Sequence, residues 1–196
     1  MTIHNKTMKH FLLPFIFLAT IISACGPTLQ QEIQLITIPE PTLKAPPEFS
    51  SQPSVSVGLF RDVRHGNFVV RNYDTLVRPA NPVNFEVEDV IRRTLVNAGF
   101  QVDNSAPVVL RGEIREWVVD IKNKMPITLN SRAVLFVEVI GPNDKRIYSG
   151  VYRGNSYFEK AVVENRDVQD MLNRSMTGAV SQIMSDSKLI GILSSF

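Results

Sequence analysis

The residues of this chain that could do acid–base or nucleophilic chemistry are few, and they lack the partners that such chemistry needs. His65 is the only histidine after residue 24, and no Gly-x-Ser-x-Gly or multi-cysteine motif accompanies it. Ser185 and Lys188 have the spacing of a Ser-x-x-Lys motif, but Ser-Asp-Asn and Lys-Thr-Gly, which accompany it in penicillin-recognising enzymes, are absent. We therefore predict that the protein is not an enzyme and holds no metal or other cofactor.

Composition and charge place the chain among globular single-domain proteins. It has 196 residues, of which 44% are hydrophobic and 20% charged. The formal net charge of +2 comes from Lys6 and Lys9, because all the acidic residues lie after them and balance the remaining basic ones. The part after residue 24 therefore lacks the positive field that nucleic acids require, and we exclude them as partners.

The first 24 residues have the layout of a secretory signal peptide. Lys6 and Lys9 precede an apolar run at 11–22, and the small residues Ser23 and Ala24 follow it. A membrane-spanning helix needs about 20 apolar residues, so this run is too short to span. Residues 1–24 are thus predicted to be a signal, and translation from Met8 would give one as well.

A single cysteine follows this signal. Ile22-Ser23-Ala24-Cys25 resembles the bacterial lipobox, whose cysteine is diacylated on sulfur and becomes the new N-terminus. The resemblance implies that Cys25 is a permanent membrane anchor, because several acyl chains together hold a protein far more firmly than one. In that class, Gly26 in place of an aspartate implies sorting to the outer membrane, on its periplasmic face.

Residues 25–53 are predicted to join the anchor to the folded domain. Proline fixes φ and removes a backbone donor, so this proline-rich stretch is expected to be a stiff tether that reaches about 80 Å from the bilayer. Residues 32–38 interrupt it with strand-forming side chains, and they either add an edge strand to a sheet or remain in an unattached linker. The six prolines are Pro27, Pro39, Pro41, Pro46, Pro47 and Pro53.

Hydrophobic periodicity over residues 54–196 predicts a single α+β domain. Apolar residues recur at three- and four-residue spacing in two stretches, which is typical of amphipathic helices, whereas the other stretches are typical of strands. We expect a two-layer sandwich in which a mainly antiparallel sheet carries both helices on one face. The predicted strands are 55–60, 68–70, 108–121, 132–140 and 146–157, and the helices lie between Asn84 and Gly99 and at 165–185.

Four local features of these elements are also predicted. The stretch 68–70 is placed as the returning arm of a hairpin with 55–60. Asn84 is expected to cap the first helix, and Gly112 to mark a bulge in the long strand around it. Gly178 weakens the second helix by about 1 kcal/mol relative to alanine, a cost that a close helix–sheet contact would offset.

Two groups of side chains are candidates for contacting a partner or a lipid headgroup. Basic residues crowd two loops which, if they meet, form a basic rim suited to acidic headgroups, peptidoglycan or an acidic protein; otherwise they are scattered solvated charges. Two tyrosines share a strand face with Gly150 and Gly154, and form either a binding face or ordinary aromatic packing over glycine. The candidates are Arg61, Arg64, Arg71, Lys122, Lys124, Tyr148 and Tyr152.

Over residues 54–190, the order and spacing of the elements resembles the YajG-like family of bacterial outer-membrane lipoproteins. The resemblance is carried by the lipobox, the prolines after it, Ala98-Gly99-Phe100 at a helix end, Val108-Val109-Leu110 in a strand, and the long C-terminal helix. It implies no catalytic activity. It also implies a fold similar to the modules of LptE-like lipopolysaccharide-assembly lipoproteins and of lipoprotein activators of peptidoglycan synthases.

Together these observations favour a non-catalytic, outer-membrane-anchored lipoprotein that serves as a binding or assembly module of the cell envelope. Its expected partners are the membrane, through the anchor, and an envelope protein. The alternative is an LptE-like lipoprotein that binds lipopolysaccharide or assists a β-barrel partner, with the basic rim and the tyrosine strand as its contacts.

Overall fold

The computed structural model describes residues 32–33, 38–42, 52–72 and 76–196. The predicted signal peptide, Cys25 and much of the predicted tether lie outside these residues. Within the described ranges, no helix combines the length and the apolar character needed to cross a bilayer.

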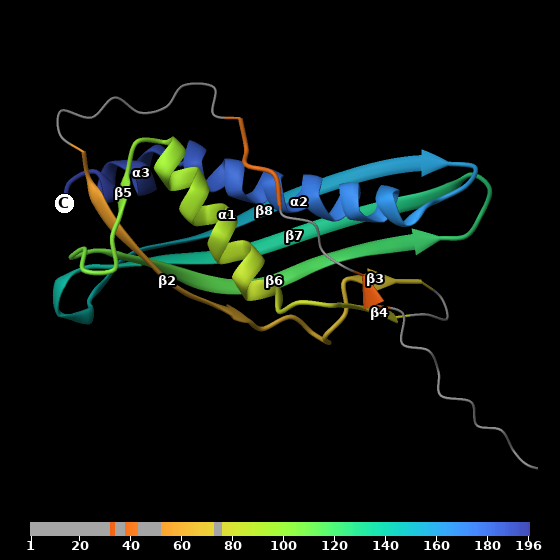
Figure 1. The fold of residues 1–196 in the computed structure, drawn as a ribbon, viewed down its shortest axis with the longest axis horizontal. Coiled ribbons are helices and arrows are strands. Elements are labelled where there is room, and N and C mark those ends of the chain that lie inside the picture. The colour runs from red at the N-terminus through yellow and green to blue at the C-terminus, as the bar shows by residue number, and fades with distance from the viewer. Residues whose placement is uncertain (1–31, 34–37, 43–51, 73–75) are drawn as a thin grey trace, which may run out of the picture.

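Eight strands, counted over the described residues, form one mixed sheet (Figure 1). The centre of the sheet consists of three long antiparallel strands, β6 (Val109–Lys122), β7 (Ile127–Ile140) and β8 (Arg146–Lys160). β7 lies between the other two and pairs with both. The α+β class is thus confirmed.

The other strands extend the sheet on the side of β6 away from β7: β2 (Ser54–Asp62), β5 (Gln101–Val102), β3 (Val70–Arg71), β4 (Leu76–Pro79) and β1 (Glu32–Ile33). β5 pairs with β2, β4 with β3, and β1 with β4. β2 and β3 both run parallel to β6, β2 against its first half and β3 against its second. The predicted hairpin between 55–60 and 68–70 is therefore wrong. The connecting loop carries the chain forward along β6 instead of reversing it.

Both predicted helices pack on one face of this sheet. α1 (Val83–Asn97) lies over β2 and β5, and α2 (Asn165–Ser185) lies along β8 and β7 (Figure 1). A third helix, α3 (Ser187–Leu193), follows at once, because the Asp186 side chain accepts hydrogen bonds from the backbone N–H groups of Lys188 and Leu189. One continuous apolar core fills the space between the helices and the sheet.

The start of α1 differs from the prediction, whereas its end does not. The helix begins at Val83, with Pro82 in the N-cap position and no side-chain cap, so Asn84 lies inside the first turn. Proline suits this place because its φ is already close to the helical value and the N–H it lacks would have no helical partner. Gly99 ends the helix with a φ of 93°, a conformation that favours glycine.

Two glycines let α2 lie directly on the sheet. A Cβ on Gly154 of β8 would lie 1.7 Å from the carbonyl oxygen of Ser175, which no packing adjustment of side chains could relieve. Gly178 of α2 faces the same point, since its Cβ would lie 3.4 Å from the Cα of Gly154. The close helix–sheet contact expected at Gly178 is therefore confirmed, and Gly154 is its partner.

The bulge in β6 lies at Arg115 and not at Gly112. The register of β6 against β7 shifts between Ile114 and Glu116. Gly112 instead allows close approach of the neighbouring strand, because a Cβ there would lie 2.1 Å from the carbonyl oxygen of Phe136.

Part of the predicted tether belongs to the folded domain. Residues 32–33 form β1, which pairs with β4. Further on, Ile38 is fully buried, and its carbonyl oxygen accepts a hydrogen bond from Arg93 of α1 at 2.9 Å. The hydroxyl of Thr177 of α2 donates to the carbonyl oxygen of Pro39 at 2.9 Å. Residues 38–42 thus lie against both helices, and the domain extends upstream of residue 54.

Candidate functional site on the open sheet face

The helices cover one face of β6, β7 and β8 and leave the other exposed. Alternate residues of β7 show the difference. Ala133 and Leu135 are buried beneath α2, whereas Arg132, Val134 and Phe136 point the other way and are exposed or half-buried. We call this second side the open face.

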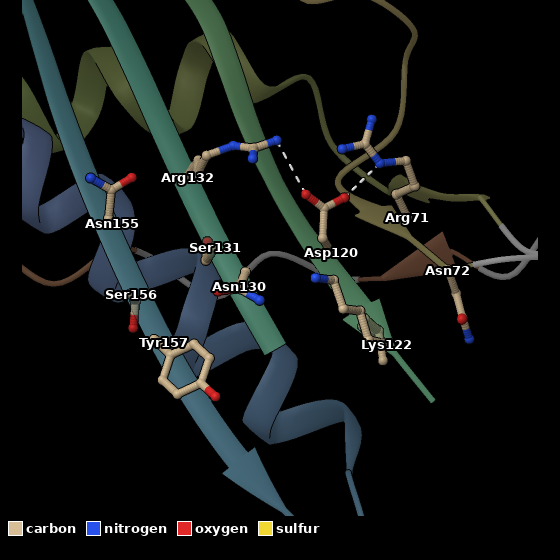
Figure 2. A pocket seen from close by; sticks show the side chains of 11 residues that line it. Arg71, Asn72, Asp120, Lys122, Asn130, Ser131, Arg132, Asn155, Ser156 and Tyr157 are labelled. Carbon is tan, nitrogen blue, oxygen red and sulfur yellow. Dashed lines mark hydrogen bonds and ion pairs between the residues drawn. The ribbon is translucent and has the colours of Figure 1, made fainter. Parts of the chain in front are cut away.

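A hollow of about 850 Å³ lies on the open face near the end of β6 (Figure 2). Each of the three central strands contributes polar side chains to it, and β3 closes one side with Arg71. The side chains that define it on the central strands are Asp120 and Lys122 of β6, Asn130 and Arg132 of β7, and Asn155 and Tyr157 of β8.

Asp120 is the electrostatic centre of this hollow. Its carboxylate accepts a hydrogen bond from Nε of Arg71 at 2.5 Å, and its other oxygen lies 3.1 Å from Nη2 of Arg132 (Figure 2). The same carboxylate raises the pKa of Arg71 through this hydrogen bond and its charge. Arg132 also contacts Glu116 at 3.3 Å. The two guanidinium groups are thereby held in fixed positions at the side of the hollow.

The remaining side chains of the hollow suit recognition rather than catalysis. Asn130 and Asn155 each offer a donor and an acceptor, and the Tyr157 side chain is 59% exposed, which leaves its ring free for packing. Lys122 adds an exposed ammonium group. Over the described residues there is no cluster of His, Cys, Asp and Glu that could hold a metal ion. This arrangement can bind a polar surface that presents donors and acceptors together.

The predicted basic rim is largely neutralised. Arg61 pairs with Glu113 at 2.6 Å, and Arg71 with Asp120 as described. The structure does bring Arg71 and Lys122 to the same hollow, and Lys124 lies in the exposed turn just after Lys122. The rim is therefore reduced to two lysines at the end of β6.

Arg64 is a buried structural residue. Its side chain is 3% exposed and binds Asp62 at 2.8 Å and the carbonyl oxygen of Phe68 at 2.9 Å. A third bond, to the carbonyl oxygen of Trp117 at 3.3 Å, fixes the loop to β6. Burial alone would raise the pKa of Asp62, but the hydrogen bonds and charge of Arg64 outweigh it and lower that pKa. Arg64 is thus not available to a partner.

The two candidate tyrosines lie on the helix-covered face. Their hydroxyl oxygens are 3.1 Å apart, and both donate to the carboxylate of Asp186, Tyr152 at 2.8 Å. Tyr152 is only 5% exposed, and this burial raises its pKa far above the ordinary value. Of the two alternatives for this strand, packing over glycine describes Tyr148 and Tyr152. Tyr157, which the alternation places on the other face, lines the hollow.

Sequence reasoning missed four residues of the hollow, namely Asp120, Asn130, Arg132 and Asn155. A signal for them exists, because each is a polar residue that alternates with buried or half-buried neighbours along its strand. What the sequence does not show is that β3 pairs with β6 in parallel, which sets Arg71 directly opposite Asp120.

The fold and the hollow define a small two-layer α+β module in which the helices leave one sheet face exposed. Residues 48–194 match the model of a protein family described as "uncharacterized lipoprotein". The chain belongs to this bacterial lipoprotein family, which indicates a membrane-anchored location in the cell envelope.

Solved structures are similar to this chain at low sequence identity, and the first of them shares its fold. Protein XCC0632 from Xanthomonas campestris is 13% identical, with a TM-score of 0.62, over 84% of this chain and 98% of that chain. A minor lipoprotein from Acinetobacter baumannii is 15% identical, with a TM-score of 0.43, over 68% of this chain and 90% of that chain. The PelC dodecamer from Paraburkholderia phytofirmans is 13% identical, with a TM-score of 0.40, over 70% of this chain and 92% of that chain. A search of curated proteins gives no significant match.

Proposed function

We propose that the protein is a non-catalytic lipoprotein of the outer membrane, anchored on the periplasmic face through Cys25, that docks onto an envelope protein through its open face. The family membership supports the anchor, and the order of elements supports a YajG-like lipoprotein in particular. The observation that carries the docking function is the hollow itself, whose polar side chains lie on three strands that pair with one another along their length.

The charges of the open face favour a protein partner over a purely anionic ligand. Asp120 already satisfies Arg71 and Arg132, so the hollow presents paired charges and amides instead of a cluster of free cations. Such a mixture fits a polar protein surface with complementary donors and acceptors. The side chain of Arg132 is still 45% exposed and can contact a partner without leaving Asp120.

Site-specific photo-crosslinking in the native envelope tests this function. A photoreactive residue at Asn155 or Tyr157 should form a crosslink of one discrete mass with a partner, which mass spectrometry then identifies. The matched control carries it at Arg174, an exposed position on α2 on the opposite side of the molecule. Equal crosslinking from Arg174, or none from Asn155 and Tyr157, would reject the open face as the docking surface.

A second candidate function is binding of lipopolysaccharide, which the exposed pair Lys122 and Lys124 beside the hollow favours. Headgroup contacts made by exposed lysines weaken with ionic strength. The full-length lipoprotein in detergent should then bind lipopolysaccharide less tightly at high salt, and a Lys122→Glu, Lys124→Glu variant should bind still less. An affinity for lipopolysaccharide that changes neither with salt concentration nor in the double variant would reject this role.

A further inference from the structure

The direction of β1, the first described strand, follows from the pairings that connect it to β6. β1 runs parallel to β4, β4 runs antiparallel to β3, and β3 runs parallel to β6. β1 is therefore antiparallel to β6, so its first residue, Glu32, lies nearer to the end of β6 than Ile33 does. Figure 1 shows β1, β3 and β4 beside the last part of β6.

The distance from the anchor to this point is short. Seven residue steps separate Cys25 from Glu32, and a fully extended chain of that length reaches at most about 25 Å. Through the pairings of β4 and β3, Glu32 lies level with Val118 of β6. The end of β6 at Lys122 is about 13 Å further along, at roughly 3.3 Å per residue. Along the sheet, Cys25 can therefore lie at most about 12 Å beyond the end of β6.

The turn after β6 and the loop after β8 expose large apolar side chains. We call residues 123–126 and 161–162 the tip. It carries Met125 and Val162, which at 77% and 67% are the two most exposed large hydrophobic side chains among the described residues. Ile127 pairs with Lys160, so the turn and the loop project from neighbouring strand ends.

The charges around the tip complement a membrane surface. Lys122 precedes the turn, Lys124 lies in it, and both are exposed. The acids nearby have partners of their own: Glu159 accepts a hydrogen bond from Tyr157, Glu164 pairs with Arg166, and Asp167 pairs with Lys160. Exposed apolar side chains beside lysines are the arrangement found where a protein rests in the headgroup layer of an anionic bilayer. The long lysine stems can keep their ammonium groups among the headgroups.

We propose that the tip inserts into the headgroup region of the same bilayer that holds the lipid anchor. The inference rests on acylation of Cys25, which is part of the proposed function, and it adds a defined orientation. The long strands stand up from the membrane, and the hollow, which Lys122 lines, opens just above the lipid surface. A partner that docks there is one whose own surface lies next to the bilayer.

The test uses the full-length lipoprotein in liposomes that contain phosphatidylethanolamine and phosphatidylglycerol. Because Cys25 is the only cysteine and acylation consumes its thiol, an introduced cysteine is the only site for a fluorophore. We would label Met125→Cys and Val162→Cys, with Lys145→Cys as the matched control, since Lys145 is exposed in the turn at the far end of β7. Nitroxide lipids labelled at the headgroup should quench the two tip sites at least about threefold more than the control.

Two further measurements separate this inference from the anchor and from docking. Flotation with the liposomes reports the anchor, so a protein that floats but shows equal quenching at all three sites overturns the tip contact alone. In the Val162→Cys protein, Met125→Asp should reduce quenching several-fold, because a charge there opposes insertion. Unchanged quenching in this variant would also contradict the inference. Crosslinking from Asn155 reports docking independently.

Discussion

The two faces of the central strands differ in what their side chains do. Beneath the helices most side chains are apolar and form the core. Polar groups on this face form hydrogen bonds inside the core, as the ring N–H of Trp117 does with the carbonyl oxygen of Leu172 at 3.1 Å. On the open face, Asp120, Arg132 and Glu138 form ion pairs at the surface. The comparison teaches that the packing of the fold lies mainly on one face, whereas the other face presents polar and charged side chains to solvent.

This division makes a direct prediction for each face. A change on the helix-covered face should lower the free energy of unfolding, because that face holds the tight packing. A change on the open face should leave the free energy of unfolding nearly constant, because exposed ion pairs contribute little. Each substitution below tests whether that difference holds.

The largest effect is expected for Gly154→Val. Its Cβ would overlap the Ser175 carbonyl oxygen and the backbone nitrogen of Ala179, so α2 must move away from the sheet. We expect a loss of about 3 kcal/mol or more in the free energy of unfolding, measured with urea. Gly191→Ala is the control, because a Cβ there meets nothing within 4 Å and alanine favours a helix. A loss below about 1 kcal/mol for Gly154→Val would contradict the close contact.

Arg64→Ala is next, because it removes a buried cation from the loop between β2 and β3. The substitution leaves two backbone carbonyl oxygens without this donor and leaves Asp62 without its partner. Since Asp62 is partly exposed, the expected loss is about 2 kcal/mol in urea unfolding, less than for a fully buried pair. Arg61→Ala, whose side chain is 66% exposed, should cost under about 1 kcal/mol. Equal losses of unfolding free energy in the two variants would contradict the structural role assigned to the buried Arg64.

Asp186→Asn tests the polar contact beneath the helices. Burial alone would raise the pKa of Asp186, but the hydrogen bonds from Tyr148, Tyr152 and the start of α3 outweigh it and lower that pKa. The stabilisation is therefore present above the ordinary aspartate pKa and is lost as pH falls through the lowered value. The variant should lose about 1–2 kcal/mol at pH 7 and show a flatter decline in acid. Asp170→Asn, at an exposed position of α2, is the control, and an unchanged acid decline in Asp186→Asn would reject this explanation.

The helices and the central strands could be predicted because their signals are local. The stripe at 165–185 gives α2 with the observed bounds, and the apolar positions of 132–140 give the buried strand. Strand pairing is not local. The stretches 55–60 and 68–70 have strand-like content, yet nothing in them distinguishes a hairpin from two successive pairings along β6.

The predicted tether and the hollow show the same limit. Ile38 ends the strand-forming stretch 32–38, and the residues that bond this part of the chain are far away in the sequence: Arg93 donates to the carbonyl oxygen of Ile38, and Thr177 to that of Pro39. The hollow depends on Arg71 and Asp120, which only the β3–β6 pairing sets opposite each other. The residue types of the site were visible in the sequence, but their positions relative to one another were not.

The smallest change in stability is expected for Asp120→Asn on the open face. The substitution removes the charge that holds Arg71 and Arg132 but keeps an acceptor of similar size. Because the side chains of Arg71 and Arg132 are 50% and 45% exposed, the free energy of unfolding should fall by less than about 1 kcal/mol. Raising the salt concentration should reduce even that difference, since screening weakens exposed pairs first.

The same variant should have a large effect on docking. Without Asp120, the two guanidinium groups lose their common partner and repel each other, so the hollow no longer presents them in fixed positions. Crosslinking from a photoreactive residue at Asn155 should then fall several-fold, while the protein remains folded by urea unfolding. A loss of more than about 2 kcal/mol would instead make Asp120 a structural residue, and would remove the distinction between the two faces at this point.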